Sequence, residues 1–266
     1  MNEMSGEAFP VVPQTTAGEN FVNGPASPLP DGVGVSVDAA RTLPDAQDVT
    51  SEPAAADALP GWRNSVARYY HAMVRASQAL MRSIARGLGL QEHFFDEAFD
   101  RGLSTLRLLH YPPRTDIEEA AEADRDVWVT HQGHRYYVTG APHVDSGFLT
   151  LLAQDGVAGL QARHRDGRWI DVPPAEGTLA VNFGKVLEKW SHGRIQATEH
   201  RVVGTGQPRM SIPFFYEARA DAEIRPLPMD AADAFEPFFY GDHLWATTTQ
   251  FVEFKGMGSL RKPLRR

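Results

Sequence analysis

Residues 143–152 read HVDSGFLTLL, a stretch that has two parts. Its second part, from Phe148 onward, is an apolar run with the length of one buried strand. In its first part, His143 and Asp145 are two positions apart. Because side chains alternate between the two faces of a strand, we expect this imidazole and this carboxylate to project together from one strand. The chain contains ten histidines, and a lone histidine is more often structural than a ligand, so the pair needs a third partner.

Short apolar or alternating runs continue on both sides of this stretch. They predict strands, separated by turn signals, at residues 106–111, 128–130, 135–138, 148–153, 159–163, 169–172, 178–182, 197–203 and 209–216. Upstream, large apolar residues recur at helical spacing from Trp62 to Ile84, which predicts a helix that Gly87 and Gly89 end. A second, short helix is expected at 90–100. Many short strands after a helical start favour a mainly β barrel or sandwich with helices on one side.

The runs 128–130 and 135–138 form a predicted β-hairpin that leads to His143. Its tip reads His131-Gln132-Gly133-His134. We expect both tip histidines to be exposed turn residues.

The chain has no cysteine. Disulfide scaffolds, iron–sulfur clusters, zinc ribbons and cysteine nucleophiles are therefore excluded, and a bound metal would need His, Asp or Glu ligands. No run of about 18 apolar residues is present, so no membrane-spanning helix is expected. The N-terminus lacks the basic start and the apolar core of a secretory signal, which makes the cytoplasm the expected location.

The net charge of −8 is concentrated at the N-terminus. Residues 1–61 hold nine acidic residues and one basic residue, whereas residues 62–266 hold 25 of each. A balanced domain offers no basic surface for phosphates, so neither nucleic acid nor a membrane is an expected partner. Residues 1–61 are also rich in proline and poor in large apolar residues, which predicts an irregular, protease-sensitive segment. We expect a domain at 62–256, with its β core at about 104–217, and a basic tail at 257–266.

His200, in the run 198–203, is the candidate for a third metal ligand. Two histidines and one carboxylate on one side of a metal leave the opposite positions open, which is typical of non-haem iron(II) oxygenases. Nine residues further on, Arg209 and Ser211 share one face of a predicted strand. A guanidinium beside a hydroxyl suits a carboxylate ligand, and the apolar run 212–216 that follows makes an unpaired arginine costly.

Taken in order, these motifs resemble the isopenicillin N synthase-like family of iron(II)/2-oxoglutarate-dependent dioxygenases. The matching segments are residues 109–113 (LHYPP), 143–145 (HVD), 147–152 (GFLTLL), 182–184 (NFG), 200–202 (HRV) and 209–211 (RMS). They span about residues 104–217, with weaker similarity in the helices from residue 62 and at 239–242. The resemblance implies a double-stranded β-helix, which is a distorted, cupin-like jelly roll, with flanking helices.

The resemblance also implies roles for individual residues. The iron ligands of the family match three residues of this chain, namely His143, Asp145 and His200. The residues that bind the distal carboxylate of 2-oxoglutarate match Arg209 and Ser211, and a tyrosine that often faces this cosubstrate matches Tyr111. Candidate pocket residues are Asn182, Phe214 and Phe215. The alternatives are a strand-end hydrogen bond for Asn182 and plain core packing for the two phenylalanines.

The activity implied by the resemblance is an oxygenase that uses Fe(II), 2-oxoglutarate and O₂. It would hydroxylate, or desaturate, a small-molecule substrate and release succinate and CO₂. One alternative is a related iron oxidase that does not use 2-oxoglutarate. Another is a truncated, non-catalytic version of the fold that binds small molecules, because the strand-and-helix unit with which family members usually begin is not found here. Without that unit one sheet edge is expected to be open, and an open edge favours a homodimer.

Overall fold

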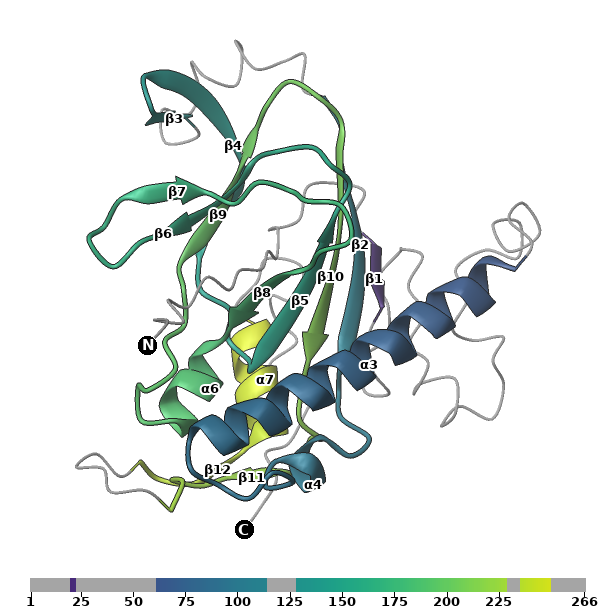
Figure 1. The fold of residues 1–266 in the computed structure, drawn as a ribbon, viewed down its shortest axis with the longest axis vertical. Coiled ribbons are helices and arrows are strands. Elements are labelled where there is room, and N and C mark those ends of the chain that lie inside the picture. Colours follow the sequence, from purple (N-terminus) through teal and green to yellow (C-terminus); the bar gives the residue numbers. More distant parts are fainter. Residues whose placement is uncertain (1–19, 23–60, 114–127, 229–234, 250–266) are drawn as a thin grey trace.

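Two five-stranded antiparallel sheets face each other in the computed structural model, which describes residues 20–22, 61–113, 128–228 and 235–249 (Figure 1). The first sheet has the order β1-β2-β10-β5-β8, with bounds Asn20–Val22, Thr105–Tyr111, Arg209–Tyr216, Leu149–Gln154 and Ala180–Phe183. The second has the order β3-β4-β9-β6-β7, with bounds Trp128–His131, His134–His143, His200–Gly204, Leu160–Arg163 and Trp169–Asp171. From β4 onward the chain passes repeatedly from one sheet to the other. This arrangement is a jelly roll, which confirms the expected fold class.

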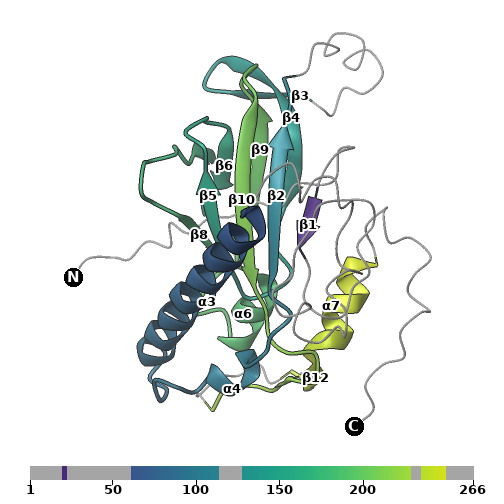
Figure 2. The same cartoon turned by 90° about the vertical axis from the view of Figure 1, so that its right-hand side faces the viewer.

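Helix α3 (Trp62–Gly87) lies along the outer face of the first sheet (Figure 2). Its buried residues, among them Tyr70 and Met81, belong to the same apolar cluster as Phe214 and Tyr216 of β10. The rings of Tyr70 and Phe214 meet edge to face, with centroids 5.1 Å apart. The predicted helix is confirmed, because one apolar face at helical spacing packs on one sheet.

No helix in the described part of the chain is both long and apolar enough to cross a membrane.

The remaining helices are short. Helix α4 (Asp96–Phe99) is much shorter than the helix expected at 90–100, because residues 92–95 form turns that bury Phe95. Helix α6 (Lys185–Trp190) follows β8, and α7 (Tyr240–Thr248) follows a small ladder of β11 (Glu223–Ile224) and β12 (Phe238–Phe239). Both α6 and α7 lie at the same end of the jelly roll, at the bottom of Figure 1.

Alternation along β10 separates residues that the sequence grouped together. Phe214 is fully buried in the cluster under α3. Arg209, Ser211 and Phe215 are an odd number of positions away, so they point to the opposite, inner face. Phe214 is therefore a core residue and not a pocket residue. A second apolar cluster, formed by Leu152, Leu160, Ala162 and Val202, joins the two inner faces.

Residues 20–22 form strand β1, which pairs with β2. The segment 1–61 was expected to be irregular. At residues 20–22 this expectation is wrong, because these residues pair with β2. The other residues of that segment up to 60 and the basic tail 257–266 lie outside the described residues.

The predicted hairpin is present as β3 and β4. Its two-residue turn has positive φ at Gln132 (49°) and Gly133 (79°), which is the geometry that matches the twist of paired strands. His134 is exposed, as expected. His131 is not: its side chain is 9% exposed, and its Nε2 lies 3.1 Å from Oδ2 of Asp171. The expectation failed for His131 because the turn folds toward β7.

Candidate metal centre

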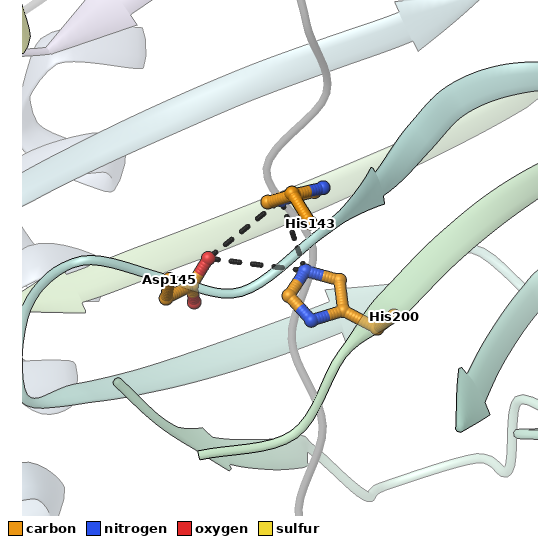
Figure 3. A group of neighbouring side chains, drawn as sticks. All are labelled: His143, Asp145 and His200. Atoms are coloured by element: carbon orange, nitrogen blue, oxygen red, sulfur yellow. Dashed lines mark hydrogen bonds and ion pairs between the residues drawn. The ribbon is translucent and has the colours of Figure 1, made fainter. Parts of the chain in front are cut away.

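His143, Asp145 and His200 meet between the two sheets (Figure 3). His143 ends β4 and His200 begins β9, and the register of the two strands pairs these residues directly. Their Nε2 atoms are 3.0 Å apart. Oδ1 of Asp145 lies 3.7 Å from Nε2 of His143 and 3.8 Å from Nε2 of His200. Three ligand atoms of the types that iron prefers thus converge on one point.

The backbone fixes the tautomer of both histidines. Nδ1 of His143 donates to the carbonyl oxygen of Ala141 (2.8 Å), and Nδ1 of His200 donates to that of Thr198 (3.0 Å). A carbonyl oxygen can only accept, so each neutral ring carries its proton on Nδ1 and presents a lone pair at Nε2. Two lone pairs facing each other at 3.0 Å repel unless a cation lies between them. Such an arrangement can hold a metal ion.

Burial keeps His200 in the neutral form, which can bind a metal. The residue is fully buried. Burial lowers its pKa to about 4, while the charge of Asp145 acts in the opposite direction. The ring is therefore neutral at pH 7. The side chain of His143 is 21% exposed, so the cluster can be approached from this side.

Asp145 is not on a strand. Strand β4 ends at His143, and Asp145 lies in the loop that leads to β5. The expectation that one strand presents both residues is therefore wrong. Thr150 Oγ1 (2.8 Å) and Asn182 Nδ2 (2.9 Å) both donate to Oδ2 of Asp145, which leaves Oδ1 turned toward the histidines. Among the described residues, Oδ1 is buried and has no hydrogen-bond donor.

Asn182 and Thr150 therefore orient a carboxylate. Asn182 is fully buried, and its amide donates to the Asp145 carboxylate from near the end of β8. Sequence reasoning missed Thr150, although it is the one hydroxyl within the apolar run 148–152 and could have been noticed for that reason. Thr150 and Asn182 are cross-strand partners on β5 and β8, so the register of the sheet sets both donors side by side.

Arg209 and Ser211 begin β10 on its inner face. Both are buried, at 3% and 1% exposure. Arg209 donates from Nη2 to Gln154 (3.0 Å) and from Nε to the carbonyl oxygen of Val157 (3.3 Å). Arg209 Nη1 and Ser211 Oγ have no partner among the described residues. Burial lowers the pKa of Arg209, but an arginine keeps its charge in proteins, so a buried donor pair is available to an anion.

Tyr111 and Phe215 occupy the same sheet face. Tyr111 pairs in register with Arg209, and its ring centroid is 5.4 Å from Cζ of Arg209. Tyr111 and Arg209 line a cavity of about 40 Å³ together with Tyr137, Thr139 and other residues near the end of β2 and the start of β10. Phe215 lies beside Thr150 across β10 and β5. Of the candidate residues from the sequence, the structure thus collects all except Phe214 on the inner side of the jelly roll.

The family model described as "2OG-Fe(II) oxygenase superfamily" matches residues 103–218. Residues 103–218 are therefore similar in sequence to this superfamily. The match begins just before β2 and ends just after β10, so it covers the jelly roll with the metal centre and excludes α3 and α7. Members of the superfamily use Fe(II) and 2-oxoglutarate, and the His-Asp-His cluster fits that metal.

Several known superfamily proteins are similar to this chain. The 2-oxoglutarate-Fe(II) type oxidoreductase hxnY of Emericella nidulans is 33% identical over 189 residues, which are 70% of this chain and 46% of that protein. Validamycin A dioxygenase of Streptomyces hygroscopicus subsp. limoneus is 31% identical over 195 residues, which are 70% and 50% of the two chains. This chain therefore spans about half the length of the curated relatives that it matches.

Solved structures of the superfamily share the fold. A full-length Neurospora crassa protein in complex with alpha-KG superposes with a TM-score of 0.64 at 26% identity, over 88% of this chain and 65% of that chain. JOX2 in complex with 2OG, Fe and JA gives a TM-score of 0.63 at 26% identity, over 86% and 59% of the two chains. The similarity extends beyond the residues that the family model matches.

Proposed function

We propose that this chain is an oxygenase that depends on Fe(II), 2-oxoglutarate and O₂ and acts on a small molecule by hydroxylation or desaturation. The observation that carries the proposal is the approach of the two Nε2 atoms of His143 and His200 to 3.0 Å, with the Oδ1 atom of Asp145 turned toward them. When bound, the iron and the cosubstrate would supply oxidative chemistry, with succinate and CO₂ as coproducts.

In this proposal His143, Asp145 and His200 hold the metal. The Nδ1 protons on Ala141 and Thr198 keep both rings in the tautomer that ligates through Nε2. The donors on Oδ2 of Asp145 reserve Oδ1 for the metal, because that carboxylate oxygen has no other use among the described residues. All three ligands lie on one side, so the opposite side stays open to other ligands.

Arg209 and Ser211 would hold the distal carboxylate of 2-oxoglutarate. Arg209 Nη1 and Ser211 Oγ are buried donors without a partner among the described residues, and leaving such donors unpaired is costly. Gln154 and Val157 already fix the guanidinium through Nη2 and Nε, so the remaining nitrogen, Nη1, has a defined direction. Tyr111 would pack on one side of this anion site.

Several finer points belong to the same proposal. Placement in the isopenicillin N synthase-like family rests on the sequence motifs. A small-molecule substrate is supported by similar proteins, such as the Neurospora crassa protein, which has also been solved with alpha-KG and thymine. The domain bounds 62–256, a cytoplasmic location and a homodimer remain predictions from the sequence.

A succinate-release screen tests the proposal. Purified, iron-loaded protein is incubated with 2-oxoglutarate and a panel of small metabolites in air, with His200→Ala as the matched control. We expect one or more metabolites to stimulate succinate formation in the wild type and none to do so in the variant. Substrate oxidation without any requirement for 2-oxoglutarate would favour the oxidase alternative. Metal binding without oxidation of any compound would favour the non-catalytic alternative.

A further inference from the structure

The loop that carries Asp145 is held from one side by α6. Between β4 and β5, residues 144–148 form no regular strand, so separate contacts must position them. The amide of Lys185 donates to the carbonyl oxygen of Asp145 (2.8 Å), and the amide of Val186 donates to that of Gly147 (3.0 Å). A Cβ at Gly184 would overlap the same Gly147 carbonyl, so the glycine before α6 allows this close approach.

A buried acid holds the loop from the other side. Glu217 directly follows β10, and its carboxyl group lies against Gly147, two positions after Asp145. A Cβ at Gly147 would overlap both carboxyl oxygens of Glu217. Tyr240, which is fully buried at the start of α7, donates its hydroxyl proton to Oε2 of Glu217. Burial raises the pKa of Glu217 to about 8, so the group is mainly a neutral acid at pH 7.

Helix α7 makes a second contact with the same loop. Nε2 of His243 lies 3.2 Å from the carbonyl oxygen of Ser146, to which it can donate. The loop residues next to Asp145 are therefore held between α6, the end of β10 and α7. Glu217 and Tyr240 link α7 to the candidate metal centre. Glu217 lies at the end of the segment that the family model matches, and Tyr240 lies beyond it.

We propose that Glu217 and Tyr240 are positioning residues, which set the place of Asp145 for metal binding through their contact with Gly147. The inference rests on the proposed role of Asp145 as a metal ligand. A buried carboxyl group and a buried hydroxyl are costly where apolar groups would pack. Because Glu217, which is bonded to Tyr240, packs against Gly147, the two residues hold the loop 144–148 in a single conformation. Groups outside the ligand set that orient a ligand typically change metal affinity by about 10- to 100-fold when they are removed.

The test is the affinity for Mn(II), followed by electron paramagnetic resonance of the full chain without 2-oxoglutarate. We expect Glu217→Ala and Tyr240→Phe to raise the Kd for Mn(II) by about 10-fold or more. Glu217→Gln should stay within about threefold of the wild type, because an amide replaces the neutral acid at the same size. Tyr216→Phe is the matched control. It removes a hydroxyl from another buried tyrosine, which faces α3 instead of the loop.

Gly147→Ala provides a second route to the same answer, should Glu217→Ala fail to fold. The new methyl group of Gly147→Ala would displace the Glu217 carboxyl group, so this variant should also weaken Mn(II) binding. Tyr240→Phe should weaken Mn(II) binding as well, with almost no change in side-chain volume. If Tyr240→Phe and Gly147→Ala bind Mn(II) as the wild type and Tyr216→Phe do, the contact is only structural and the inference is overturned. If the wild type itself binds no Mn(II), the proposed metal centre fails instead.

Discussion

Replacing Arg209 with alanine should weaken the binding of 2-oxoglutarate by about 10- to 150-fold. The magnitude follows from the one donor, Nη1, that has no partner among the described residues. A hydrogen bond to a charged group contributes roughly 1.5–3 kcal/mol, and every 1.4 kcal/mol corresponds to a factor of about ten in affinity. The assay is an anaerobic titration of the iron-loaded protein with 2-oxoglutarate, followed by the weak visible charge-transfer absorption of the complex.

Two milder variants refine this prediction. Arg209→Lys should recover only part of the affinity, because lysine keeps the charge but loses the planar fork that Gln154 and Val157 hold in place. Ser211→Ala should cost about fivefold, since a bond from a neutral hydroxyl contributes roughly 1 kcal/mol. Fe(II) affinity without the cosubstrate serves as the control and should not change in any of the three variants.

If Arg209→Ala folds and its requirement for 2-oxoglutarate is unchanged, Arg209 does not bind this cosubstrate. Arg209 is only 3% exposed, so the melting temperature of each variant must be measured as well. Ser211→Ala leaves the packing around Arg209 in place and keeps the prediction testable if Arg209→Ala does not fold. Loss of substrate affinity instead of cosubstrate affinity would assign the anion site to the substrate and favour the oxidase alternative.

Three further predictions concern the metal and the buried acid. Asn182→Ala removes a donor to Asp145 and should raise the Kd for Mn(II) by about 10-fold or more. Asn182→Asp should raise this Kd further, because it places a second carboxylate beside that of Asp145. Metal at about 100 times its Kd should stabilise the wild type by roughly 2.7 kcal/mol in urea unfolding and should not stabilise His200→Ala. Burial raises the pKa of Glu217 from 4.5 to about 8, so the native state keeps a proton that the unfolded chain releases. Stability should therefore fall as the pH rises from about 4.5 to 8. Between pH 5.5 and 7.5 the metal-free wild type should lose roughly 2–3 kcal/mol relative to Glu217→Gln, and equal pH profiles for the two proteins would contradict the burial argument.

Much of the framework could be predicted because it depends on local periodicity. The apolar face of α3 and the short strands follow from spacing alone, and the positions of β2, β5 and β10 differ from the predicted runs by at most one residue at each end. Alternation along β10 could also have separated Phe214 from Arg209 and Ser211. That parity is visible in the sequence, and the expectation that Phe214 and Phe215 both line the pocket ignored it.

The rest depends on contacts between distant segments. The cluster of His143, Asp145 and His200 was predicted. The strand geometry used for Asp145 was wrong, since this residue lies in a loop and accepts from two donors on β5 and β8. Strand β1 has three residues and no periodic signal, and its partner β2 is more than 80 positions away in the chain. The contact of Glu217 with Gly147 joins positions 70 residues apart, and no local pattern marks it.

Anomalous diffraction at the iron absorption edge would locate the metal directly. Crystals of the full chain would be grown without oxygen in the presence of Fe(II) and 2-oxoglutarate. We predict a single iron peak about 2 Å from Nε2 of His143, Nε2 of His200 and Oδ1 of Asp145, with the distal carboxylate of 2-oxoglutarate at Arg209. An iron peak elsewhere, or none at these three atoms, would contradict it.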